Sequence, residues 1–123
     1  MENALIDRIK AVTIAVRDQD EALAWYVDKL GFAVKADIGV PGFRWLTVAP
    51  AGQEDTEFLL ASWFPDHVGR NATCVLHTHD CEKGYRTLSA RGVEFTQAPQ
   101  AKPYGTEAIF QDLYGNRYAL VEA

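Results

Sequence analysis

The chain has 123 residues, of which 48% are hydrophobic and 24% charged, and this balance is typical of one globular domain rather than of a disordered chain. The formal net charge of −5 argues against a basic face for nucleic acid. The apolar stretches are far shorter than the ~20 residues of a membrane span, so we expect no membrane partner either.

The first half of the chain predicts a strand, a helix and three further strands. Residues 9–16 (IKAVTIAV) alternate with period two, which is typical of a strand with one apolar side. Asp18 then provides a helix cap, and Gly31 provides a helix stop. Three strand-like segments follow, at 32–38, 43–49 and 56–63.

The second half repeats this order. A strand at 72–78 precedes a helix from Asp80 to about Ala90, and Gly92 ends that helix at an offset of 61 residues from Gly31. The remaining strands are predicted at 93–97, 106–111 and 117–122.

This repeat predicts two modules within one domain over 1–123. A module of about 55–60 residues with one helix does not easily bury its own core, so we expect the two to pack together. Their bounds are predicted at about 8–64 and 71–122. The linker between them, 65–70 (PDHVGR), contains His67, which we expect to be a solvated loop residue.

The strand at 9–16 also predicts which of its faces is covered. Its three large side chains share one parity and are expected beneath the helix: Val12, Ile14 and Val16. The small side chains of the other parity leave room in front of the strand: Ala11, Thr13 and Ala15. The same parity places further residues of later strands on this open side: Glu57, Leu59, Ala61, Trp63, Arg117 and Ala119.

These patterns together predict an α+β fold. We expect two tandem βαβββ modules to form a curved mixed sheet with a ligand cup on one side and helices on the outside. Concave, mostly apolar sites with few polar groups are where small ligands bind.

The ordered segments VTIAVRDQDEALAWYVDKLGF, FRWLTVAP, TEFLLA, ARGVEF, KPYGTEAIFQD and YGNRYALVE resemble the vicinal oxygen chelate superfamily. This superfamily includes glyoxalase I, bleomycin-resistance proteins and extradiol dioxygenases, and the resemblance covers residues 9–122. It implies paired modules, a cupped site and commonly a homodimer. It does not fix the function, because the fold hosts isomerases, oxygenases, lyases and ligand-sequestering proteins.

Metal-using members of this superfamily place a ligand on the first and fourth strand of each module. The resemblance puts Ala11, Glu57, Thr73 and Ala119 at these positions. A catalytic ion needs about three protein ligands and an open position, whereas alanine has no donor atom and a threonine hydroxyl is a poor ligand. We therefore predict no metal and no other cofactor. Glu57 then needs a cation, a proton or a donor such as Arg117.

Three further side chains are weighed as candidates for chemistry. His77 and His79 share one strand parity, but no third nitrogen ligand is evident, so we expect two partly exposed histidines. Cys81 lies near a helix N-terminus, where a thiolate would be stabilised. Without a general base at a known spacing, we predict a structural role for it.

The two cysteines, Cys74 and Cys81, form no disulfide framework, and the start MENALIDRIK does not resemble a signal peptide, so we expect a cytoplasmic protein.

The predicted function is that of a metal-independent protein that binds and sequesters a planar or cationic small molecule, as bleomycin-resistance proteins do. Aromatic walls in an acidic protein suit such a ligand through stacking and cation–π attraction. The alternative is a glyoxalase-like lyase or isomerase that uses Glu57 as its base, with or without a divalent metal. The expected ligand-binding residues are Thr13, Trp45, Glu57, Leu59, Trp63, Thr73, Tyr104 and Arg117.

Overall fold

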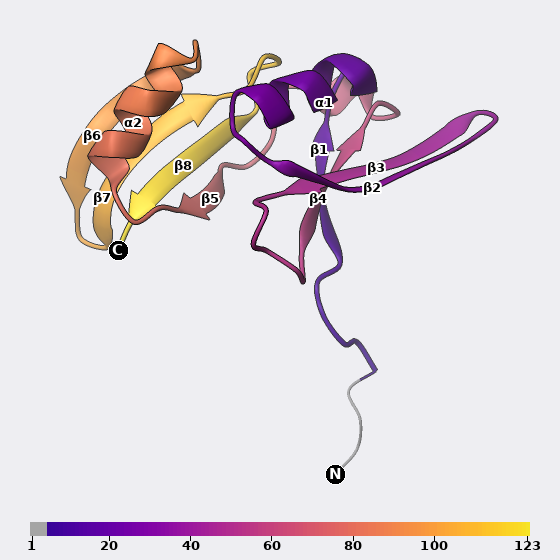
Figure 1. Cartoon of the computed structure of the whole chain (residues 1–123), viewed down its shortest axis with the longest axis horizontal. Helices are drawn as coiled ribbons and strands as arrows, with labels where there is room; N and C mark the ends of the chain where they lie inside the picture. The colour runs from indigo at the N-terminus through magenta and orange to yellow at the C-terminus, as the bar shows by residue number, and fades with distance from the viewer. Residues whose placement is uncertain (1–4) are drawn as a thin grey trace.

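The computed structural model describes residues 5–123 and contains two four-stranded sheets, each with one helix (Figure 1). The first module comprises β1 (Ala11–Ala15), α1 (Gln19–Asp28), β2 (Ala33–Val40), β3 (Phe43–Ala49) and β4 (Glu57–Ala61). The second comprises β5 (Cys74–His77), α2 (Cys81–Ala90), β6 (Glu94–Lys102), β7 (Gly105–Gln111) and β8 (Arg117–Glu122). The predicted α+β fold with two βαβββ modules is confirmed. Residues 1–4, which belong to the predicted domain and to the segment MENALIDRIK, lie outside the described residues.

Both sheets have the same mixed topology. Sheet A has the order β1-β4-β3-β2 and sheet B the order β5-β8-β7-β6. The first strand of each module pairs in parallel with the last, and the other pairs are antiparallel. An offset of 62 residues carries α1 onto α2 and β3 onto β7, so the sequence repeat is also a repeat of structure.

The helices begin and end where the sequence predicts. The Asp18 and Asp80 side chains each accept a hydrogen bond of 3.0 Å from a backbone N–H in the first turn of their helix. Gly31, with φ of 72°, and Gly92, with φ of 92°, adopt the left-handed conformation that ends a helix. No helix within 5–123 is long and apolar enough to cross a membrane.

Three segments differ from the prediction. β4 ends at Ala61 instead of residue 63, so Trp63 lies beyond the end of the strand. β6 extends to Lys102, through Pro99, instead of ending near residue 97. Proline is tolerated there because β6 lies at the edge of sheet B and its register is already shifted around this point. The linker is also not a plain loop, since Pro65–His67 forms a 3-10 helix, η1.

One apolar core joins the two modules. Ile14 and Val16 lie in it as predicted, together with Tyr26 of α1. Phe110 and Tyr118 of sheet B belong to the same cluster. Val12 shares the parity of Ile14 and Val16 but is 38% exposed, so the start of β1 is not covered as expected.

A buried polar network, which we call the seam network, crosses the boundary between the modules. The Tyr26 hydroxyl donates to Asp112 Oδ2 (2.6 Å) and lies 2.7 Å from the Tyr118 hydroxyl. Asn116 donates from Nδ2 to the Ala15 carbonyl and to Asp112 Oδ2, both at 2.9 Å. Burial is the main cause that raises the pKa of both tyrosines, so they remain neutral donors. The seam network therefore fixes how the second module sits against β1.

Candidate functional site

The side of sheet A that faces away from its helix is called the open face here. Strand register places Thr13 of β1, Leu59 of β4 and Thr47 of β3 in one row across it. Neighbouring rows contain Ala11 beside Glu57, and Ala15 beside Ala61. The predicted parity of β1 and β4 is thus confirmed. Thr47, Leu59 and Ala61 on this face are buried, whereas Thr13 is exposed.

Aromatic rings form a continuous row at one end of the open face. The ring centroids of Phe43 and Trp63 are 5.2 Å apart, those of Trp63 and Phe64 6.0 Å, and those of Phe64 and His67 6.1 Å. Trp63 is 40% exposed, so part of its indole can contact a ligand. We call these four residues the aromatic row. Trp63 was predicted for the site, whereas Phe43 was missed although it shares the strand parity of Trp45.

A cavity of about 280 Å³ lies where the linker passes β1. Its lining residues are Thr13, Ala15, Phe64, His67, Arg70 and Asn71. We call this cavity the linker pocket. His67 is exposed, as expected of a linker residue, but the linker also forms one wall of this cavity. No local pattern indicates this cavity, because only the tertiary fold brings residues 64–71 against β1.

The linker is held in place from the second module. The backbone N–H of Gly69 donates to Asn116 Oδ1 (3.1 Å), which ties the linker to the seam network. Asn71 donates to the Arg117 carbonyl (3.1 Å) and accepts from the Arg117 N–H (2.8 Å). Gly69 has φ of +74°, and a Cβ atom there would lie 2.5 Å from the Tyr114 carbonyl oxygen. Only glycine fits this close approach.

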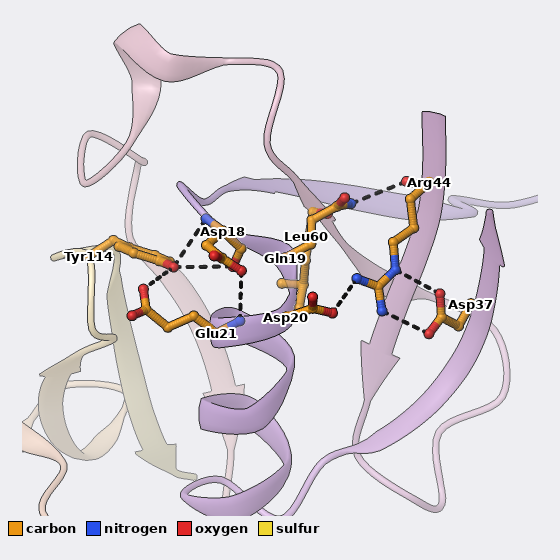
Figure 2. Close-up of polar contacts among 8 residues, drawn as sticks. All are labelled: Asp18, Gln19, Asp20, Glu21, Asp37, Arg44, Leu60 and Tyr114. Carbon is orange, nitrogen blue, oxygen red and sulfur yellow. Dashed lines mark hydrogen bonds and ion pairs between the residues drawn. The ribbon is translucent and has the colours of Figure 1, made fainter. Parts of the chain in front are cut away.

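The N-terminus of α1 fastens β3, which carries Phe43, and β4, which leads into Trp63 (Figure 2). The Gln19 side-chain amide donates to the Leu60 carbonyl (2.8 Å) and to the Arg44 carbonyl (3.1 Å). The Arg44 guanidinium forms ion pairs with Asp20 (2.6 Å) and Asp37 (2.8 Å), and its hydrogen bond lowers the pKa of Asp37. These contacts position β3 and β4 relative to the helix.

Tyr114 links the same helix end to the second module (Figure 2). Its hydroxyl accepts from the Asp18 N–H (3.2 Å) and donates to Glu21 Oε1 (2.6 Å). Burial, followed by the bond to Glu21, raises the pKa of Tyr114, which keeps the hydroxyl protonated as a donor. The guanidinium of Arg17 lies 5.6 Å above the ring centre. The N-terminus of α1 is thus bonded both to sheet A and to Tyr114 of the second module.

Glu57 lies at the other end of the open face and is half-buried. Within residues 5–123 its side chain takes part in no hydrogen bond or ion pair. Arg117, the predicted donor, is on β8 of the other sheet. The carboxylate therefore remains available to a ligand on this face.

The residues present do not fit the superfamily's metal site. Ala11 and Glu57 are neighbours in sheet A, whereas Ala119 lies in sheet B and Thr73 precedes β5. Glu57 is the one strong donor among the four. Nowhere in residues 5–123 do three or more His, Cys, Asp or Glu side chains gather so that they could hold a metal.

The histidine pair on β5 and the following loop does not change this conclusion. The rings of His77 and His79 are 5.2 Å apart and nearly perpendicular. Both side chains are exposed, as predicted.

Cys81 is fully buried at the start of α2. Its thiol donates to the Leu120 carbonyl (3.5 Å). Burial, followed by the charge of Glu122, raises the pKa of the thiol, so the helix N-terminus does not make this residue a thiolate. The geometry is that of a structural cysteine.

Sheet B carries a second carboxylate that sequence reasoning missed. Glu107 is 9% exposed and accepts hydrogen bonds from the Tyr104 hydroxyl (2.6 Å) and from Gln97 Nε2 (3.2 Å). The bond to Glu107 is the main cause that raises the pKa of Tyr104. Glu107 shares a face of sheet B with its register partner Val121, and this parity was the signal that could have identified it.

The predicted site residues fall into two groups. One group lies on or beside the open face of sheet A: Thr13, Trp45, Glu57, Leu59 and Trp63. The other belongs to the second module: Thr73, Tyr104 and Arg117. The structure places the two groups on different sheets of one chain.

Comparisons with known proteins agree with this architecture. The family model of the Glyoxalase/Bleomycin resistance protein/Dioxygenase superfamily matches residues 8–120. The protein YurT of Bacillus subtilis (strain 168) is 36% identical over 126 residues, covering 94% of this chain and 98% of YurT. Two crystal structures are similar along nearly the whole chain. TnmS3, an antibiotic-binding protein from Streptomyces sp. CB03234, has a TM-score of 0.87 and 34% identity, covering 97% of this chain and 98% of TnmS3. UcmS2 has a TM-score of 0.86 and 35% identity, covering 97% of this chain and all of UcmS2.

Proposed function

Since the chain belongs to the Glyoxalase/Bleomycin resistance protein/Dioxygenase superfamily, we propose that it binds and sequesters a small planar compound on the open face of sheet A. The observation that carries this proposal is the aromatic row, which continues into the linker pocket through Phe64 and His67. Stacking on partly exposed rings is a common way to hold a planar ligand. The similarity to TnmS3, which is an antibiotic-binding protein, supports a small molecule as the ligand.

Binding is proposed to need no metal, and a positive charge on the ligand is proposed to face Glu57. Alanine at positions 11 and 119 leaves Glu57 without companion ligands for an ion. Glu57 is a half-buried carboxylate that pairs with no side chain within residues 5–123, and such a group attracts a cation more strongly than a solvated one does.

We expect Trp63→Ala to weaken every planar ligand, and Glu57→Gln to weaken only cationic ones. Proflavine serves as a planar cationic dye, and N-phenyl-1-naphthylamine serves as a neutral dye with a planar naphthalene ring. Loss of the Trp63 indole should cost about 1–3 kcal/mol of binding free energy for both dyes. Fluorescence titrations of wild type and both variants, with and without EDTA, measure these effects.

Glu54→Gln, in the exposed loop before β4, is the matched control for Glu57→Gln and should leave both affinities unchanged. Equal binding by wild type and Trp63→Ala would contradict the placement of the ligand on the aromatic row. A loss of binding in EDTA would contradict metal independence.

We also propose a homodimer in which the open face of sheet A meets sheet B of a second copy. Such an arrangement would bring the predicted site residues of sheet B and its hairpin, Tyr104 and Arg117, to the rim of the open face of the other copy. Apolar side chains with high exposure support an interface, and they include Ile38 (62%) on sheet A and Val75 (70%) on sheet B. The segment before β1, which extends away from the sheets in Figure 1, adds Leu5 at 101% exposure.

Light scattering at micromolar concentration should therefore give about twice the 13.7 kDa mass of one chain. Val75→Glu introduces a charge into the proposed interface and should shift the mass toward that of one chain. Ala24→Glu, on an exposed position of α1, should not. A wild-type mass near 13.7 kDa would argue against the dimer.

A further inference from the structure

We propose that the linker pocket recognises an anion, so that the ligand carries an ionised acidic group, such as a carboxylate, sulfonate or ionised phenol, next to its aromatic rings. This inference rests on the proposed function, because the rings of the same ligand would lie on the aromatic row. It adds a chemical class to that ligand at the end of the open face away from Glu57.

The hydrogen-bonding groups of the pocket are matched to an anion. Its polar lining consists of Arg70, His67, Asn71 and Thr13, and it includes no carboxylate. The Asn71 amide is already bonded to the Arg117 backbone, so Arg70, His67 and Thr13 are the groups proposed to meet an anion. A guanidinium is permanently charged and presents a planar set of donors that suits carboxylate and sulfonate oxygens. Asp66, the acidic neighbour within η1, is exposed like His67 and Arg70, but it does not line the pocket. This local excess of donors contrasts with the net charge of −5 of the chain.

The pocket is built before any ligand arrives. Gly69 and Asn71 are hydrogen-bonded to Asn116 and Arg117, which lie outside the linker. Within the linker, the N–H of Arg70 donates to the carbonyl of His67 (3.0 Å). Because the backbone that carries Arg70 and His67 is already ordered, binding an anion costs little additional loop entropy.

The aromatic row and the pocket share a wall. Phe64 contacts Trp63 in the row and also lines the pocket beside Arg70. A ring system stacked on Trp63 and Phe64 can therefore direct an acidic substituent toward the guanidinium. Thr13 and Ala15 form the β1 side of the same cavity, while Phe64, His67 and Arg70 on the linker side are exposed. The substituent would therefore stay partly hydrated, and the guanidinium would hold it through charge-assisted hydrogen bonds.

A matched pair of dyes distinguishes the contribution of an anionic group to binding from that of the aromatic rings. 1-Anilinonaphthalene-8-sulfonate and N-phenyl-1-naphthylamine have the same ring systems, and the first has an additional sulfonate. Fluorescence titrations at fixed ionic strength compare wild type, Arg70→Gln and His67→Gln. We expect Arg70→Gln to weaken the sulfonate dye about tenfold or more and the neutral dye less than about twofold. His67→Gln should weaken the sulfonate dye by a smaller factor.

Arg86→Gln is the control, because Arg86 is an exposed arginine on α2 and does not line the pocket. Equal losses in Arg70→Gln and Arg86→Gln would mean that only the overall charge matters, and would overturn the inference. The inference would also be overturned if wild type bound the two dyes with equal affinity and Arg70→Gln weakened neither of them. In that case Trp63→Ala still weakens the neutral dye and the proposed function stands. If wild type binds neither dye, both the proposed function and the subsite are contradicted. Unchanged circular dichroism and unchanged neutral-dye affinity show that Arg70→Gln is folded.

Discussion

Asp112→Ala is expected to lower the free energy of unfolding by about 3–5 kcal/mol. The carboxylate is 4% exposed and accepts four hydrogen bonds. The donors are the Tyr26 hydroxyl (2.6 Å), the Tyr114 N–H (2.8 Å), and the backbone and side-chain amides of Asn116, each at 2.9 Å. Alanine leaves these buried donors without their acceptor. The free energy of unfolding of a small domain is only about 5–15 kcal/mol, so this loss is a large fraction of the total stability.

Thermal and urea unfolding, followed by circular dichroism, measure this effect, and the melting temperature should fall by about 10–20 °C. Asp28→Ala makes the same change at an exposed position at the end of α1 and should move stability by less than about 0.5 kcal/mol. If the two variants were equally stable, the seam network would not hold the modules together.

Gly69→Ala is expected to cost stability and also to damage the linker pocket. An alanine at φ of +74° is strained by about 1–2 kcal/mol, and its Cβ would lie 2.5 Å from the Tyr114 carbonyl oxygen. The clash is with backbone, so the linker has to move. We expect a total loss of about 2–4 kcal/mol and, because Arg70 moves with the linker, weaker binding of 1-anilinonaphthalene-8-sulfonate.

Gly31→Ala is the control that separates the effect of backbone strain from the effect of moving the linker. Gly31 has nearly the same φ, 72°, but the nearest atom to its added Cβ is the end of the Arg91 side chain at 4.0 Å. This variant should lose about 1–2 kcal/mol through strain alone and keep its dye affinity. Equal dye affinities for both glycine variants would show that the linker backbone does not shape the pocket.

Most of the fold could be predicted from short-range signals in the sequence. Asp18 and Asp80 mark the helix starts, Gly31 and Gly92 mark the ends, and period-two alternation marks β1. These signals act through local hydrogen bonds and side-chain direction, which need no tertiary information. The end of β6 was missed because Pro99 normally argues against a strand, and only the edge position in the sheet makes it acceptable.

The candidate site was only partly predictable. Parity located Thr13, Glu57 and Leu59 on one face, because strand register follows from alternation. The linker pocket depends on the long-range bond between Gly69 and Asn116, 47 residues apart. Nothing in the local sequence specifies such a pairing.

The repeat has diverged on the faces that would meet a ligand while it kept its backbone. At the shared offset of 62 residues, Trp45 on β3 corresponds to Glu107 on β7, and Glu57 on β4 corresponds to Ala119 on β8. The first half thus has an indole where the second has a carboxylate, and it has a carboxylate where the second has a methyl group. In addition, the linker that connects the two halves lies against β1 and lines the linker pocket there. Internal duplication has therefore not produced two equivalent sites, and titration to saturation should give a stoichiometry of one ligand per chain rather than two.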